Sequence, residues 1–264
     1  MLDRHQVGLA RRLMRRPGAV VDVGCGPGRF LWHIQRYGIP AVGVEITSTC
    51  VDFATKTLGL DVRTRWPADI VAPALVTFWH SLEHMPLDAL TATLQAVSQT
   101  AAADTVVLVS VPNADSWLSR VFGKENTYYD NPNHVHQFTP RSLDACMASC
   151  GFERCGSHPS WLYSWVGWSL SLLSAVGPGH NYYYYTRKRG TDFGFSPAKR
   201  HAWNAALTAS APVAAAIGGM LTLLDLAVPR HAAVIQQSYQ LSSHAPAADR
   251  PRQQSPGSPD HVAP

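Results

Sequence analysis

The stretch VDVGCGPGR, residues 21–29, decides the fold of this 264-residue chain. It opens like a short buried strand, and its glycines, Gly24, Gly26 and Gly28, precede residues with helical spacing. Glycines at such a turn tolerate the sharp change of direction. They also let the backbone approach a nucleotide-like ligand, because no side chain blocks the contact. The stretch therefore predicts the ligand-binding turn of a doubly wound α/β domain.

Two side chains narrow the class of ligand. Arg29 occupies the sixth position of the pattern G-x-G-x-x-G, where a dinucleotide-binding turn has Gly or Ala, so pyrophosphate binding is disfavoured. Asp22 precedes Gly24 by two residues, and its carboxylate would attract a ligand that carries a positive charge. A nicotinamide-dependent oxidoreductase is therefore the weaker alternative.

Strand-like and helix-like segments alternate along the chain on both sides of this turn. This alternation predicts a parallel, doubly wound sheet. The expected strands are residues 19–23, 41–45, 60–64, 75–80, 104–111, 152–158 and 232–241. The residues Leu87, Leu90, Leu94 and Val97 form a helical stripe, and Thr139 can cap a helix over residues 139–151.

Composition limits the functional classes. The chain is 46% hydrophobic and 15% charged, which excludes a disordered or fibrous protein. A net charge of +4 is too small to indicate a nucleic-acid groove. The first residues lack the apolar core of a signal peptide, and the number of cysteines is odd, so we expect free thiols in the cytoplasm.

The N-terminal residues 1–17 predict a helix with a basic face. Leu2, Leu9 and Leu13 share one side, and five arginines occupy the rest. This face is either simply solvated or attracted to an anionic membrane surface.

The motif at residues 22–28 resembles the first motif of class I S-adenosylmethionine-dependent methyltransferases, an acid followed by G-x-G-x-G. Three further segments, 77–86, 111–116 and 130–139, are similar to a subgroup of these enzymes, the ubiquinone-biosynthesis-like small-molecule methyltransferases. The similarity runs from about residue 18 to residue 157. It implies a seven-stranded, mostly parallel, Rossmann-like sheet whose last two strands form an antiparallel pair.

The resemblance also implies the cofactor, S-adenosylmethionine, and its contacts. Glu45, 17 residues after Gly28, matches the acid that holds the ribose hydroxyls, and a carboxylate can accept both hydrogen bonds of a diol. Residues 64–73 lack a clear acid for the adenine. Asp69 is the candidate there, and otherwise backbone groups and Ile46 hold the base. The expected cofactor contacts are thus Asp22, Gly24, Cys25, Gly26, Gly28, Glu45, Ile46, Asp69 and His80.

Three histidines are candidate proton acceptors for methylation of an oxygen atom, because histidine titrates near neutral pH. The resemblance puts the loop of His134 and His136 over the active site, where a purely structural role for both is the alternative. His84 follows the fourth strand, and its neighbour Glu83 is interpreted as a helix-start or loop-fixing residue. A zinc site from His134, His136, Cys146 and Cys150 is disfavoured, because core packing explains the cysteine spacing, and no metal is expected.

Residues 159–230 form an apolar insertion between the last two expected strands. A run of 23 uncharged residues, 202–224, is long enough to span a membrane, but a spanning hairpin would place five positive charges on the wrong side. The remaining alternatives are a packed helical cap and a cap that dips into the membrane interface. The tail, 244–264, is expected to be disordered.

The sequence thus predicts a cytoplasmic methyltransferase that acts on a small, apolar or lipid-linked acceptor, with a peripheral membrane contact as a further expectation. We favour an oxygen acceptor, such as a quinone precursor, polyketide or glycolipid sugar. The alternatives are carbon or nitrogen methylation at the same site, or an inactive membrane-surface binding protein of the same fold.

Overall fold

The computed structural model describes residues 2–67, 69–130, 132–188 and 190–243, with the Lys188 side chain excepted. The expectation of a disordered tail concerns residues 244–264, which lie outside the described residues.

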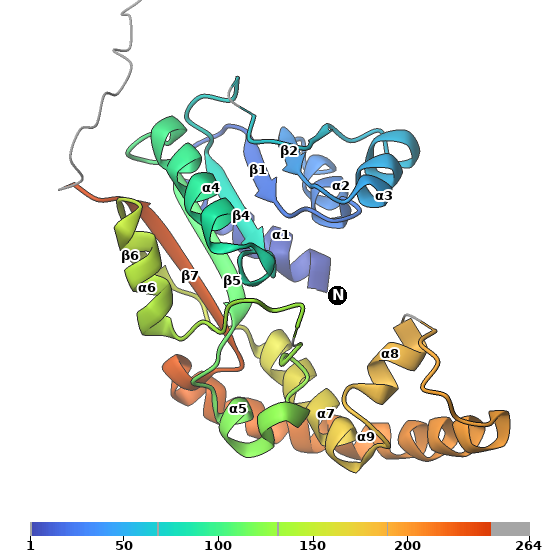
Figure 1. Ribbon diagram of the computed structural model, residues 1–264. Coiled ribbons are helices and arrows are strands. Elements are labelled where there is room, and N and C mark those ends of the chain that lie inside the picture. Colours follow the sequence, from blue (N-terminus) through green and yellow to red (C-terminus); the bar gives the residue numbers. More distant parts are fainter. Residues whose placement is uncertain (1, 68, 131, 189, 244–264) are drawn as a thin grey trace, which may run out of the picture.

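A seven-stranded sheet forms the centre of the molecule (Figure 1), in the order β3-β2-β1-β4-β5-β7-β6. Neighbouring strands are parallel except around β7, which is antiparallel to both β5 and β6. The prediction of a Rossmann-like sheet ending in an antiparallel pair is therefore confirmed. The strands are β1 (Val20–Val23), β2 (Ala41–Val44), β3 (Val62–Arg63), β4 (Leu75–Trp79), β5 (Val106–Pro112), β6 (Phe152–Ser157) and β7 (Val234–Leu241).

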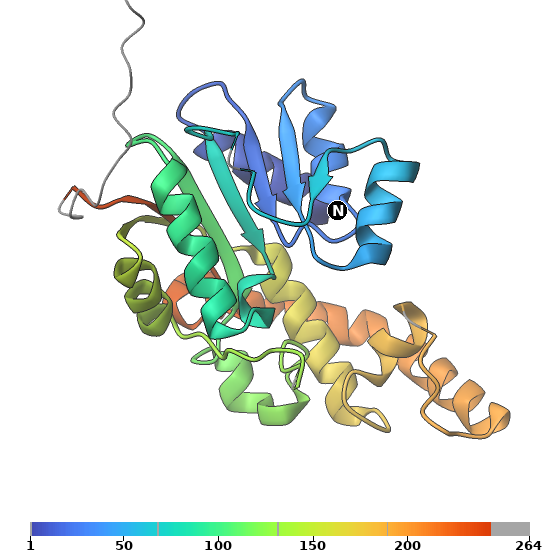
Figure 2. The same cartoon turned by 45° about the horizontal axis from the view of Figure 1, so that its top comes forward.

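Helices cover both faces of this sheet, because the central strands are apolar on both sides. Val21 and Val23 belong to a core shared with α4 and α6, whereas Val20 packs with α1 and α2 on the other face. Figure 2 shows the helices on the two sides of the sheet. The helices of the sheet domain are α1 (Leu2–Leu13), α2 (Arg29–Gln35), α3 (Ser48–Asp52), α4 (Leu87–Thr100), α5 (Trp117–Phe122) and α6 (Pro140–Ser149). Short 3-10 or π segments are η1 (Phe53–Thr57), η2 (Leu82–His84), η3 (Gly123–Glu125) and η4 (Pro229–His231).

Two local expectations need correction or detail. Leu90, Leu94 and Val97 are buried as predicted, but Leu87 is exposed, because it lies in the first turn of α4, before the helix meets the sheet. The cap of α6 is confirmed: the Thr139 hydroxyl accepts a hydrogen bond from the Ser142 amide, and the Ser142 hydroxyl accepts one from the Thr139 amide.

Three more helices lie between β6 and β7: α7 (Trp161–Val176), α8 (Tyr182–Lys188) and α9 (Pro197–Ala227). Both α7 and α9 lie beyond the carboxyl ends of the parallel strands, and the first part of α9 projects away from the sheet (Figure 1). The buried Asp225 carboxylate fixes the other end of α9, since it accepts hydrogen bonds from Trp168 Nε1 at 3.2 Å and from the Ala233 amide at 3.1 Å.

Candidate functional site

The glycine turn between β1 and α2 is built so that side chains are excluded. Gly24 has a φ of +72°, and a Cβ there would lie 2.3 Å from the Ser81 Cβ. Ser81 cannot retreat easily, because its hydroxyl donates a hydrogen bond to the Val23 carbonyl at 2.7 Å. Gly28 has a φ of +80°, and a Cβ there would lie 2.5 Å from Leu60 Cδ1. Both positions therefore require glycine, and the turn is held against the segment that follows β4.

Glu45, directly after β2, fixes the same turn from the other side. Its carboxylate accepts hydrogen bonds from the Gly26 amide at 2.9 Å and from the Ile46 and Thr47 amides at 2.8 Å each. The carboxylate is thereby oriented before any ligand binds.

A cavity of about 440 Å³ opens beside Glu45 at the carboxyl edge of the sheet, where α/β folds of this kind bind ligands. Val23, Gly24 and Glu45 line it on one side, and His80 and His84 line it on another. The remaining lining residues are Val44, Ile46, Thr47, Thr64, Arg65, Trp66, Ser81, Met85, Pro86, Ala89 and Thr93. Its size suits a nucleoside-sized ligand, and Trp66 Nε1 is a buried donor without a hydrogen-bond partner in the described part of the chain. The cavity therefore fits S-adenosylmethionine.

Asp22 lies underneath the turn rather than in the cavity lining. The side chain is only 2% exposed, and its carboxyl accepts a hydrogen bond from the Thr77 hydroxyl at 2.7 Å. Burial raises the pKa of Asp22 to about 7, while the Thr77 hydrogen bond acts in the opposite direction. Asp22 thus holds a proton at slightly acidic pH and a negative charge above it.

Four histidines gather around Glu83, in the short segment that follows β4. His80 Nδ1 lies 3.4 Å from Glu83 Oε1, and the His84 and His134 rings are 4.6 Å apart. The His136 amide donates a hydrogen bond to the Glu83 carbonyl at 3.2 Å. The fold therefore brings the 130–139 loop to the segment after β4, and all three candidate histidines lie at one place.

Glu83 is the charged centre of this group. Its side chain is 1% exposed, and neither carboxylate oxygen has a hydrogen-bond partner within the described part of the chain. Burying a carboxylate is costly unless positive charge or donors compensate it. The nearby histidines can provide both when one of them holds an additional proton. Glu83 lies in the first turn of η2, in line with its interpretation as a helix-start or loop-fixing residue, but the sequence did not indicate its place among the histidines.

The protonation states of two histidines follow from their surroundings. His84 Nδ1 lies 2.9 Å from the Asn133 carbonyl, which can only accept, so Nδ1 carries the hydrogen and Nε2 is left with a lone pair in the neutral ring. Burial lowers the pKa of His134, although the charge of Glu83 acts to raise it. Among the described residues, Glu83, His84 and His134 also place ligand atoms within 4.8 Å of one another, close enough to hold a cation.

His80 sits in a strained conformation at the end of β4. Its φ is +53°, a region that is uncommon for residues with a side chain and often marks functional sites. Its ring stacks on Tyr128 at 6.1 Å and meets Tyr163 of α7 at 4.9 Å between centroids. These tyrosines connect the α7 segment to the site. The sequence singled out neither of them: Tyr163 stands in an apolar run that looks like core, and Tyr128 stands in a polar stretch before the 130–139 segment.

Of three other predicted cofactor contacts, only Ile46 lines the cavity. Asp69 is exposed and forms an ion pair with Arg63, and it does not line the cavity. Cys25 is buried beneath the turn, where burial raises the pKa of its thiol. Ile46 does line the cavity and is 84% exposed, so an adenine packed on it would cover an open apolar side chain. The roles of these residues remain predictions.

Comparisons with known proteins agree on the type of domain. A family model described as a methyltransferase domain matches residues 5–154. The crystal structure of mycolic acid cyclopropane synthase CmaA1 complexed with SAH and CTAB is similar in fold, with a TM-score of 0.55, 15% identity, and coverage of 90% of this chain and 83% of that chain. A SAM dependent methyltransferase from Archaeoglobus fulgidus gives a TM-score of 0.50 at 16% identity, covering 90% and 94% of the two chains. A search of curated proteins gave no significant sequence match.

Proposed function

The chain belongs to the methyltransferase-domain family and is an S-adenosylmethionine-dependent methyltransferase, and we propose that it methylates an oxygen atom of a small, apolar or lipid-linked acceptor. The segments 77–86, 111–116 and 130–139 support a place in the ubiquinone-biosynthesis-like subgroup. A phenolic quinone precursor is the acceptor class that we favour.

The cofactor supplies an activated methyl group on a sulfonium, and the protein has to align the acceptor and remove its proton. The oriented carboxylate of Glu45 is suited to hold the ribose hydroxyls. Ile46 and Trp66 are suited to hold the adenine, because both line the cavity beside Glu45. Among the other lining residues, His80, His84, Met85 and Pro86 belong to the segment after β4, and we place the acceptor beside them.

One observation carries the choice of an oxygen acceptor: His84 lines the cavity with its Nδ1 hydrogen committed to the Asn133 carbonyl. Its Nε2 is therefore the atom that accepts the acceptor's hydroxyl proton. The buried Glu83 carboxylate stabilises the imidazolium that forms, because one of its oxygens lies within 4.8 Å of a ring nitrogen of His84. The His134 ring lies 4.6 Å from the His84 ring, and burial lowers its pKa, which disfavours an opposing positive charge beside the imidazolium.

The surroundings of the site support an apolar acceptor. Tyr163 is buried and Tyr128 is half-buried, and both rings pack against His80, which lines the cavity. Burial raises the pKa of both phenols, so they stay uncharged. An uncharged aromatic layer behind His80 favours a flat, apolar acceptor over a charged one.

Calorimetric titration with S-adenosylmethionine and its demethylated product, with NAD as the control, tests cofactor binding first. Transfer of labelled methyl groups to phenols, catechols and amines then tests the acceptor. His84→Ala should lower transfer to a phenol by about 10²–10⁴-fold, the usual contribution of a general base, while cofactor affinity stays unchanged. Exposed His201 on α9 provides the matched control, His201→Ala. Unchanged transfer in His84→Ala would refute the proton-acceptor role, and preferred transfer to amines would favour nitrogen methylation.

We further propose that the enzyme works at the cytoplasmic surface of a membrane, through α9. By length and composition α9 is the one helix in the described residues that could cross a membrane. The face of α9 turned away from α7 is apolar, with exposed Val213, Ile217, Met220, Leu223 and Leu224. No residue from 202 to 224 is charged, whereas a solvent-facing helix normally carries charges there.

The two ends of α9 complement an anionic lipid surface. Lys199 and Arg200 are exposed at its start and Arg230 just beyond its end, while the nearby acid, Asp225, is buried on the opposite face. An apolar face bounded by cations suits a helix that lies in the membrane interface. It also suits an acceptor that is itself dissolved in lipid.

Flotation with vesicles of phosphatidylglycerol and phosphatidylcholine tests this surface. The pair Met220→Ser and Leu223→Ser should release most of the protein from vesicles, because it removes two large exposed side chains. The control pair, Val121→Ser and Val135→Ser, changes exposed valines outside α9. Equal flotation of the two double variants would refute the proposal. It would also be refuted if the wild type bound no vesicles but formed a stable dimer that the α9 double variant abolished.

A further inference from the structure

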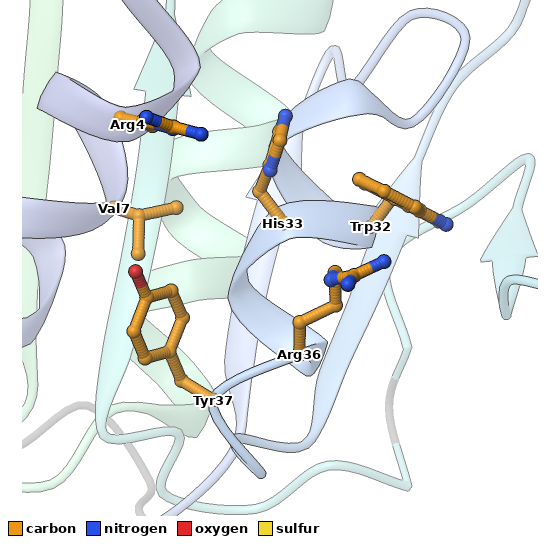
Figure 3. Close-up of a pocket in the computed structure, with 6 residues that line it drawn as sticks. All are labelled: Arg4, Val7, Trp32, His33, Arg36 and Tyr37. Atoms are coloured by element: carbon orange, nitrogen blue, oxygen red, sulfur yellow. The ribbon is translucent and has the colours of Figure 1, made fainter.

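A second hollow lies between α1 and the end of α2 (Figure 3). Its volume is about 360 Å³, and its walls are Arg4 and Val7 from α1 with Trp32, His33, Arg36 and Tyr37 from α2 and its end. It shares no lining residue with the cavity beside Glu45. The reaction described above makes no use of it.

The charges of this hollow are one-sided. Arg4 points from α1 toward His33, and no carboxylate belongs to the lining (Figure 3). The nearby acid, Asp3, is engaged by Arg29 at 2.8 Å and approached by His33 at 3.8 Å. Within the described residues no ion pair joins Arg4 or Arg36 to a carboxylate. Cations held together without an acid between them attract an anion.

An aromatic wall holds one of these two cations, Arg36, in place, and a further arginine outside the lining, Arg11, packs on the ring of Tyr37. The Arg36 guanidinium lies 4.5 Å from the Trp32 ring centroid, and the Arg11 guanidinium lies 4.4 Å from that of Tyr37. Stacked guanidinium groups lose less freedom when they bind a planar or tetrahedral anion, and their donors stay available at the edge.

An apolar hollow of about 580 Å³ adjoins the cationic one and shares Trp32 and His33 with it. Its other walls are Pro27, Arg29, Phe53 and Leu58, and the Phe53 side chain is 46% exposed. Because the two hollows meet at Trp32 and His33, we treat them as one groove that is cationic at one end and apolar at the other.

We propose that this groove binds an amphipathic anion, with a phosphate or carboxylate head at Arg4 and Arg36 and a hydrocarbon body across Trp32 onto Phe53 and Leu58. The anionic head group meets the arginines, and the hydrocarbon body meets the apolar side chains beyond Trp32. The groove is thus a second ligand site of this enzyme, separate from the site of methyl transfer.

Isothermal titration with decyl phosphate, below its micelle concentration, tests the proposal on the full chain. Saturable binding with one site per chain is expected, and the double change Arg4→Gln and Arg36→Gln should weaken it at least tenfold. Arg15→Gln, an exposed arginine beyond the end of the same helix α1, is the matched control and should change affinity less than twofold. Phe53→Ser should weaken decyl phosphate but leave inorganic phosphate unchanged.

Three outcomes would overturn the proposal. Equal affinity for decyl phosphate and decyltrimethylammonium would show that the cations do not select the head group. Equal affinity for inorganic phosphate and decyl phosphate would show that the apolar half takes no part. An unchanged affinity in the double arginine variant, with a thermal midpoint like that of the wild type, would place the ligand elsewhere.

Discussion

At the scale of single residues, Glu45 has two tasks that a substitution can separate. It accepts three backbone hydrogen bonds that shape the glycine turn, and its position beside the cavity suits it to the ribose. Glu45→Ala should weaken S-adenosylmethionine binding by about 1–3 kcal/mol, because polar groups are left without partners. Calorimetry on Glu45→Gln, which keeps one acceptor oxygen, should give a smaller loss. Equal affinity in all three proteins would remove the ribose assignment.

Asp22 should make stability depend on pH in a direction opposite to that of most acids. Its pKa in the folded state, about 7, lies above the usual value, so ionisation is easier in the unfolded chain. The protonated form stabilises the fold at low pH, and this contribution is lost as pH rises from about 4 to about 7.

Comparison with Asp22→Asn isolates this effect, since asparagine keeps an oxygen for the Thr77 hydroxyl. Urea unfolding from pH 4 to pH 9 should show the variant gaining stability relative to the wild type as pH rises to about 7. The gain should be at most about 1.4 kcal/mol for each step of one in pH, and the difference should then stay constant. A difference that is independent of pH would mean that Asp22 titrates normally.

Sequence reasoning reached some residues of the site and not others, for physical reasons. Glu45 could be predicted from the sequence, because one helix and one strand set its distance along the chain from the glycine turn. Glu83 looked like an ordinary loop acid, since the histidines around it come partly from a segment 50 residues later. Tyr163 was hidden because its apolar neighbours predict packing, whereas only the fold brings it against His80.

At the scale of elements, α9 depends on one buried carboxylate. Asp225→Ala leaves the Trp168 indole and the Ala233 amide without an acceptor. We expect a loss of about 1–3 kcal/mol in the free energy of unfolding for each unpaired donor. Urea denaturation should show it. Asp225→Asn keeps an acceptor oxygen and removes the buried charge, so its free energy of unfolding should stay close to that of the wild type. If Asp225→Asn lost as much stability as Asp225→Ala, the charge of Asp225 and not its hydrogen bonds would be the stabilising feature.

The elements themselves differ in how well the sequence predicts them. Strands such as β5 are continuous apolar runs with no helical alternative, so their position follows from composition. β3 is only two residues long and lies at the sheet edge, where few neighbouring residues can bury apolar side chains. Its sequence signal is therefore weak. In α7 and in residues 202–224 of α9 the absence of charge is evident from the sequence. The pairing of α7 with α9, however, depends on small residues, such as Gly218 against Ser169, that give no periodic signal.

At the scale of the whole molecule, the order of strands makes the C-terminal part essential. Among the described residues β6 pairs only with β7, and β5 is covered on that side by β7. A chain ending at residue 233 should therefore show no cooperative thermal transition. A chain ending at residue 243 keeps all seven strands and should match the full chain in midpoint and cofactor affinity. Cooperative unfolding of the shorter chain would show that β1 to β5 are stable alone.

The same placement of β7 affects how the protein is made in the cell. At ~5–20 residues per second, the ribosome needs roughly 4–15 s to produce residues 158–233 after β6 has been translated. During that time the edge of β5 and both edges of β6 have no partner from their own chain, and such edges pair readily with strands of other chains. The enzyme should consequently be a client of chaperones that bind nascent chains, and its soluble yield should fall when many ribosomes follow closely on one message.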